Sequence, residues 1–328
     1  MPLGVRALLL FLLAGCGDGQ GTPPEGPDAR ARLEVCATSV EELLATAMAQ
    51  APTAGSGGYR MPDAPARDDL AQSLAVARDD AVEAERRADA ASYRLCVVSG
   101  DDLFVWMPLD ASLGHAFIAY RPAAPRGVIV EVPHPFFDVD TATEALAVFD
   151  GLDARALIVA GTHRCANTGE PSGCDGTTSA CGANAPYPTS DMAHTTESFF
   201  QVAHEVLAER HVDDWILSLH GMAGDGVHVS NGTTLATTGD APVARIAAAL
   251  AIELPDETIA SCNDHPGATT TASLCGTTNT QGRHVNGAAS ACTDAATHAT
   301  GRFLHLEQSS SVRGRTSAVA AAIDAVAP

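Results

Sequence analysis

GVIVEVPHP (127–135) is the stretch that decides the expected fold. Its β-branched residues favour a strand, and the two prolines that flank His134 end that strand. Three more apolar runs also lead into a polar residue: RALIVAGTHR (155–164), WILSLHG (215–221) and GRFLHLEQS (301–309). Ligands of open α/β sheets bind at the carboxyl ends of the strands. We therefore expect four side chains to gather at one edge of a sheet: His134, Arg164, His220 and Glu307.

Strand-like and helix-like segments alternate from this stretch onward. Strands are expected at 127–133, 155–161, 214–219 and 302–308. Helices are expected at 141–150, 190–210, 241–253 and 312–326. Short β-rich runs come earlier, at 94–99, 103–107 and 115–120. Alternation is typical of a parallel sheet covered on both faces, and the early runs favour an antiparallel edge. The predicted fold class is therefore α/β, with a mostly parallel, mixed central sheet and helices on both faces.

The composition is that of a globular protein. The chain has 328 residues, of which 46% are hydrophobic, and this is enough to bury a full core. The formal net charge is −21. Nucleic-acid binding needs clustered cations, so we expect no nucleic-acid partner. The dinucleotide fingerprint Gly-x-Gly-x-x-Gly is absent, so we expect no nucleotide either.

The N-terminus looks like a targeting segment. Arg6 precedes the apolar run ALLLFLLA (7–14), and Cys16 follows two residues later. This pattern resembles the bacterial lipoprotein signal, which is cleaved before a lipidated cysteine; an ordinary secretory signal is the alternative. Both readings export the protein, and the first anchors it to a membrane through lipid alone. We divide the chain into a signal (1–16), a Gly/Pro-rich tether (17–35), a helical lead-in (36–92) and an α/β catalytic domain (93–328).

Eight cysteines remain once Cys16 is set aside. An even number of cysteines in an exported chain indicates disulfides, but the spacing leaves the pairing open. No Cys-x-x-Cys pair occurs, which argues against a cysteine zinc site. Several of the cysteines lie in Gly/Ser/Thr-rich stretches that bury little apolar surface. We interpret them as structural links that hold long loops.

Two histidines and a carboxylate form a candidate metal site. His134 and His220 each end a strand, and Asp138 follows His134 by four residues. Glu131, inside the first strand, is a second candidate carboxylate. Zinc at catalytic sites takes three nitrogen or oxygen ligands from the protein and keeps one position for water.

Glu307 is the candidate general base. It lies on the last expected strand, and a carboxylate opposite a metal-bound water can accept its proton. His305 shares the face of Glu307 by strand alternation and is a candidate hydrogen-bond partner.

These motifs resemble those of a known superfamily. His134-Pro-Phe-Phe-Asp138, Leu-His220-Gly and Leu-Glu307-Gln-Ser, with Arg313 after it, are similar to motifs of poly-γ-glutamate hydrolases, a branch of the zinc carboxypeptidase-like fold. N-formylglutamate amidohydrolases share a similar plan. The resemblance implies zinc ligands His134, Asp138 and His220, with Glu307 as the base.

The chain departs from the family pattern at two places. Asp138 stands where the relatives usually carry Glu, which leaves Glu131 or a water as alternatives for the second ligand. The Gly-Gly that follows the first histidine in poly-γ-glutamate hydrolases is Pro135-Phe136 here, which puts that particular substrate in doubt.

Several polar residues are candidates for substrate binding. Carboxypeptidase relatives hold a substrate carboxylate with Arg and Asn, and GTHRCAN (161–167) offers Arg164 and Asn167 at a strand end. The planar guanidinium of Arg164 suits a carboxylate, although a surface ion pair is the alternative. Arg313 is a further candidate from the family motif, and Arg283 is a weaker one.

The expected helix 190–210 offers a rival metal site. His194 and Glu197 are three residues apart, with His204 further along the same stripe and Asp191 as the expected cap. The second histidine of a His-Glu-x-x-His site is missing, so we place His194 near the pocket as a substrate-binding or supporting residue.

The predicted protein is an exported, lipid-anchored zinc hydrolase of amide bonds. Its expected substrate is an anionic peptide-like molecule, with glutamyl compounds included. The alternative is a non-catalytic surface lipoprotein that uses the same fold to bind a ligand or partner.

Overall fold

A computed structural model describes residues 33–36, 39–98, 102–268 and 272–328. The predicted signal peptide, with its lipidation site Cys16, and most of the tether lie outside these residues. Within them, no helix is both long enough and apolar enough to cross a bilayer.

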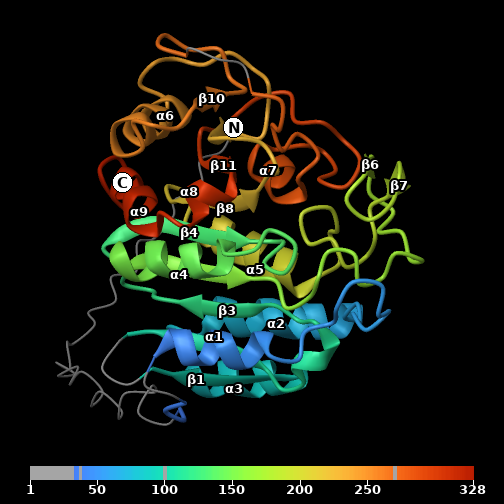
Figure 1. Cartoon of the computed structure of the whole chain (residues 1–328). Coiled ribbons are helices and arrows are strands. Elements are labelled where there is room, and N and C mark those ends of the chain that lie inside the picture. Colours follow the sequence, from blue (N-terminus) through green and yellow to red (C-terminus); the bar gives the residue numbers. More distant parts are fainter. Residues whose placement is uncertain (1–32, 37–38, 99–101, 269–271) are drawn as a thin grey trace, which may run out of the picture.

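A nine-stranded mixed sheet runs through the molecule (Figure 1). Its strands, in spatial order, are β1 (Tyr93–Val97), β2 (Phe104–Pro108), β3 (Phe117–Tyr120), β5 (Ala154–Val159), β4 (Arg126–Val132), β8 (Trp215–Gly221), β11 (Phe303–Gln308), β9 (Val227–Ser230) and β10 (Ile259–Ser261). β5, β4, β8 and β11 are parallel, whereas β1, β2 and β3 form an antiparallel edge. This confirms the predicted fold class.

Helices cover both faces of the sheet. One face packs against α1 (Val40–Met48), α4 (Thr141–Gly151), α6 (Pro242–Glu253) and α9 (Thr316–Asp324). The other packs against α2 (Ala64–Val76), α3 (Ala81–Ala90), α5 (Phe199–Arg210) and α7 (Thr280–Val285). Alternation along β8 sends Leu217 and Leu219 into the first layer and leaves Ser218 and His220 on the side of the second.

Two predicted helices differ from the structure, and three short elements were not predicted. The helix expected at 190–210 begins only at Phe199, because the side chain of Ser198 caps it by accepting the amide of Gln201. The helix expected at 312–326 is split into α8 (Ser310–Arg313) and α9. Strands β9 and β10 and helix α7 were not predicted, because each has six residues or fewer and shows no clear periodicity.

Four disulfides join the eight cysteines of the described chain. Cys36–Cys96 ties the segment before α1 to β1. The other three lie in the loops beyond the carboxyl ends of the strands: Cys165–Cys181, Cys174–Cys292 and Cys262–Cys275. One pair of short strands in these loops, β6 (Thr177–Thr178) and β7 (Ala185–Pro186), forms a separate ribbon. Four disulfides are typical of a protein that folds in an oxidising compartment.

Candidate metal centre

The carboxyl ends of β4, β8 and β11 bring the predicted site residues together. β11 and β8 are parallel neighbours, and their register places Glu307 beside His220. His134 follows β4 directly. A tight turn after it, closed by the amide of Asp138 on the carbonyl of His134 (2.8 Å), returns the Asp138 carboxylate to the same position.

The geometry of these side chains fits a metal ion. Asp138 Oδ2 lies 3.4 Å from His134 Nδ1 and 3.6 Å from His220 Nδ1. Ligand atoms about 2.0–2.1 Å from a tetrahedral zinc are separated by about 3.3 Å, which is close to both Asp138 distances. The three ligand atoms all lie within 4.8 Å of one another, as one shared ion requires. All three residues are buried, and His134 Nδ1 has no hydrogen-bond partner among the described residues. A buried nitrogen without a partner is costly unless something else occupies that position.

Both histidines present the same ring nitrogen to this position. His134 Nε2 lies 2.7 Å from Asp191 Oδ1, and His220 Nε2 lies 3.0 Å from Ser218 Oγ. A ring that gives its Nε2 proton to such an acceptor keeps a lone pair on Nδ1 for a metal. Neither supporting residue was predicted from the sequence, which favoured a helix cap for Asp191. A carboxylate eight residues before the first residue of a helix carries no local signal of this role.

The rival metal position next to His194 is filled by hydrogen bonds. Asp191 Oδ1 lies 2.9 Å from His194 Nδ1 in addition to its contact with His134, and both distances are those of direct hydrogen bonds. Arg164 donates to the other oxygen of Asp191, from Nη2 at 2.6 Å and Nε at 3.1 Å. A guanidinium this close disfavours a second cation.

The other residues of the predicted rival site are dispersed. Glu197 lies before α5 rather than on it, and its nearest ion-pair contact is Arg67 at 3.9 Å. His204 is buried in the sheet–helix layer, where its Nδ1 lies 2.6 Å from Glu131 Oε1. Glu131 is therefore engaged away from the metal position, which leaves Asp138 as the carboxylate of the site.

Glu307 is placed beside the ligand set and opens to solvent. Its side chain is 15% exposed, and its carboxylate belongs to a cluster with His220 and His305. His305 Nε2 lies 3.6 Å from Glu307 Oε1, which is a close contact but longer than a hydrogen bond. Burial, followed by the negative charge of Asp138, holds the pKa of Glu307 well above its usual value.

The histidine environments favour metal binding to different degrees. Burial is the main reason that the pKa of His220 is lowered to about 4, so this ring is neutral and ready to bind at neutral pH. Burial and Arg164 also act to lower the pKa of His134, but Asp191 and Asp138 outweigh them and raise it. A metal must therefore displace a proton from His134 under mildly acidic conditions.

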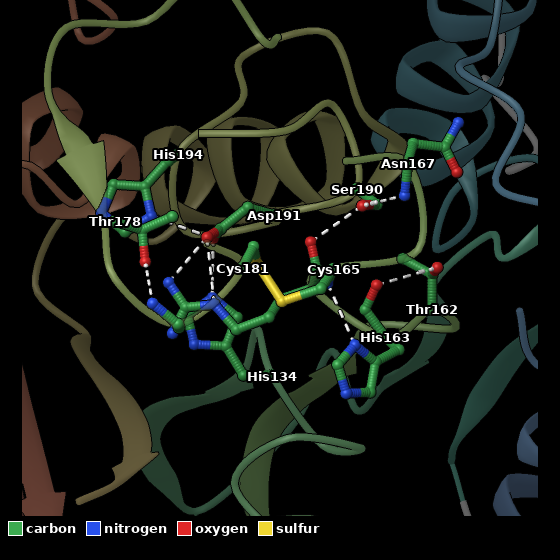
Figure 2. Close-up of a disulfide and its surroundings, with 12 residues drawn as sticks. His134, Thr162, His163, Cys165, Asn167, Thr178, Cys181, Ser190, Asp191 and His194 are labelled. Carbon is green, nitrogen blue, oxygen red and sulfur yellow. Dashed lines mark hydrogen bonds and ion pairs between the residues drawn. A yellow bond between two sulfur atoms is a disulfide. The ribbon is translucent and has the colours of Figure 1, made fainter. Parts of the chain in front are cut away.

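A cavity of about 360 Å³ leads to this centre. It is lined by four residues of the centre, His134, His220, His305 and Glu307, and by Arg164 and His194. The loop segments 177–179 and 273–279 complete its lining. The Cys165–Cys181 disulfide lies next to the Asp191 cluster, as Figure 2 shows.

Of the predicted substrate-binding residues, Arg164 and His194 line the cavity, and Asn167, Arg313 and Arg283 do not. Asn167 bonds the backbone of Tyr59 and the carboxylate of Glu170. Arg313 donates to the carbonyls of Val139 and Gln308. Arg283 donates to the carbonyls of Thr277 and Cys292. These three residues hold loops in place around the site.

Comparisons with known proteins return structural neighbours only. No family model and no curated protein matches the chain. A solved structure assigned as a metallopeptidase from Shewanella amazonensis is similar at 13% identity, covering 65% of this chain and 82% of that one, with a TM-score of 0.35. Succinylglutamate desuccinalase from Vibrio parahaemolyticus is similar at 10% identity, covering 72% and 78%, also with a TM-score of 0.35. Because these TM-scores are low, the chemistry inferred below depends on the residues of this chain alone.

Proposed function

We propose that this protein is an exported, zinc-dependent hydrolase of amide bonds. The observation that carries the proposal is the set of His134 Nδ1, His220 Nδ1 and Asp138 Oδ2, spaced for one tetrahedral ion and open to a cavity beside Glu307. Two nitrogens and one carboxylate oxygen are a donor set that zinc prefers. His134, Asp138 and His220 would hold the ion, which when bound polarises a carbonyl and acidifies water.

The chain's own residues supply the remaining roles. Glu307 accepts the proton of the attacking water and delivers it to the leaving nitrogen. Asp191 orients His134, and Ser218 orients His220. Arg164 lines the cavity while Asp191 holds its Nε and Nη2 groups, which leaves Nη1 to bind an anionic group of the substrate.

We propose an anionic peptide-like substrate, with glutamyl amides as the first compounds to test. Arg164 is the only arginine among the described residues that line the cavity, and it has one donor group left. The eight paired cysteines support export. Lipidation at Cys16 is the proposed anchor, and mass spectrometry of the mature N-terminus tests it directly.

Elemental analysis and one substitution test the proposal. We expect about one zinc per purified chain and little in a His134→Ala, His220→Ala variant. Glu307→Gln should keep the zinc but reduce hydrolysis of γ-glutamyl, formyl-amino-acid or cell-wall peptide amides by about 10²–10⁴-fold. Glu197→Gln, an exposed site of the same chemistry, is the matched control.

If the purified chain takes up no zinc even after reconstitution, the proposed enzymatic function is contradicted. A chain that binds zinc and a peptide, but hydrolyses equally slowly with and without Glu307, is the non-catalytic binding lipoprotein.

A further inference from the structure

A row of hydrogen bonds leads from the metal ligand His134 to the loop wall of the cavity. Asp191 Oδ1 lies 2.7 Å from His134 Nε2 and 2.9 Å from His194 Nδ1. On the far side of His194, Nε2 lies 3.1 Å from Thr278 Oγ1. The hydroxyl of Tyr187 lies 3.1 Å from that same Thr278 oxygen. We call these five residues the His134–Tyr187 row.

The direction of every bond in the row follows from the carboxylate. An ionised carboxylate only accepts, so His134 and His194 must both donate to Asp191. A neutral His194 then accepts at Nε2 from the Thr278 hydroxyl, and Thr278 in turn accepts from Tyr187. Arg164 supplies two further donors to the other carboxylate oxygen, so Asp191 is fully used. At the opposite end, His134 is left with its lone pair on Nδ1, facing Asp138.

Packing holds the wall end of the row in place. The rings of Tyr187 and His194 stack with centroids 3.6 Å apart and an angle of 4°. Gly176 also lies against the ring of Tyr187, where an added Cβ would come within 2.7 Å of Cε2. Tyr187 and Thr278 both line the cavity. The segment that carries Thr278 follows Cys275, which is bonded to Cys262.

We infer that Tyr187 and Thr278 are positioning residues for the metal centre. Both hydroxyl groups fix the orientation of His194. His194 and Arg164 together fix the Asp191 carboxylate. Asp191 in turn keeps the proton of His134 on Nε2. The inference rests on the proposed function, since it concerns the same site. Coupling is reciprocal, so a metal ion at His134 must also stabilise the wall that carries Tyr187 and Thr278.

Zinc affinity, measured by chelator competition, tests the coupling. Thr278→Val keeps the shape but removes the hydroxyl, and we expect zinc to bind about five-fold more weakly, the effect of one hydrogen bond. Thr277→Val, the neighbouring threonine of the same wall, should leave the affinity unchanged. In a His194→Phe background, which retains an aromatic ring but breaks the row, Thr278→Val should have no further effect. Equal effects in the two backgrounds would overturn the inference.

Nitrogen NMR of the metal-free protein gives an independent reading. At a pH where His134 is neutral, the row requires the Nε2–H tautomer, and Thr278→Val should increase the Nδ1–H form. A parent that already has the proton on Nδ1 contradicts the inference, whether or not zinc binds. A parent with the Nε2–H tautomer that takes up no zinc contradicts the proposed enzyme and leaves the row intact.

Discussion

The two halves of the candidate site are held in place by different means. Strand ends provide one half, with His220 on β8 and Glu307 on β11, and each of these strands is bonded on both sides. Loops 177–179 and 273–279 provide the other half. Around them the regular structure is limited to the ribbon of β6 and β7 and one turn and a half of α7, and three disulfides hold the chain.

This difference assigns the proposed metal chemistry to the half at the strand ends (the sheet half) and substrate selectivity to the half made of loops (the loop half). A strand that is paired on both sides cannot shift its side chains without breaking ladder hydrogen bonds, so His220 and Glu307 are held in fixed positions. His134 and Asp138 lie in the tight turn that directly follows β4, a strand that is also paired on both sides. A disulfide stabilises a loop mainly by lowering the conformational entropy of the unfolded chain. The sequence of such a loop is therefore freer to vary than that of a strand. We therefore expect changes in the sheet half to affect metal binding and turnover, and changes in the loop half to affect stability and substrate affinity.

The largest effect on stability is expected beneath the sheet half. Glu144 on α4 is buried and accepts a bond from Gln308 Nε2 (2.7 Å), and burial raises its pKa from 4.5 to about 8. The folded state thus keeps this proton to higher pH than the unfolded state does. Stability from this group is complete below pH 4.5 and is lost as pH rises to about 8, by on the order of 4 kcal/mol. Urea unfolding of Glu144→Gln should show little of this loss.

The comparison to make is the difference in unfolding free energy between parent and Glu144→Gln at pH 5 and at pH 8. A difference that stays constant between these values would show that Glu144 is ionised throughout.

Removing Cys174–Cys292 should affect the loop half alone. This disulfide closes the widest span of the three, with a sequence separation of 118. The Cys174→Ser, Cys292→Ser variant should lose about 2–4 kcal/mol of stability and raise the KM, while its zinc content stays near the parent's. Cys36→Ser, Cys96→Ser, a pair distant from the cavity, is the matched control for KM. Loss of zinc with the loop disulfide would mean that the two halves are not separable in this way.

The smallest expected effect comes from one methyl group at the edge of the sheet half. A Cβ on Gly221 would lie 2.5 Å from Arg313 Nη1 and 3.1 Å from Asp138 Cβ, so Gly221→Ala must push Arg313 or Asp138 aside. We expect a loss of about 1–3 kcal/mol in stability, with weaker zinc binding. Gly224→Ala, whose nearest neighbour is Met222 Sδ at 3.5 Å, should change neither quantity. Differential scanning calorimetry with and without zinc distinguishes the two variants.

The features of the sheet half could be predicted from the sequence, whereas those of the loop half could not. The end of a strand can be recognised from local sequence, because a β-branched run followed by a polar residue is a pattern that spans only a few positions. His134, Asp138, His220 and Glu307 could therefore be singled out and do lie together. Disulfide pairing depends on contacts between distant segments, and spacing could not supply it.

The part of the predicted helix that covers residues 190–198 is wrong for a related reason. His194 and Glu197 have helical spacing, and Asp191 has the chemistry of a cap, so local rules favour a helix. Tertiary contacts override them, since the Asp191 carboxylate is bound by His134, Arg164 and His194 instead of by helix amides. Asn167 was predicted to bind substrate from its place near a strand end and from the carboxypeptidase relatives, and Arg313 from the family motif. Their backbone partners become visible only in the fold.

The place of β11 in the sheet also has a consequence for the order of assembly. This strand is the last along the sequence, yet it lies between β8, to which it is parallel, and β9, to which it is antiparallel. A nascent chain that has reached β10 already carries all three proposed zinc ligands but no Glu307, and its β8 and β9 lack the strand that joins them. The proposed general base is therefore synthesised last, after the three proposed ligands and the residues that orient them.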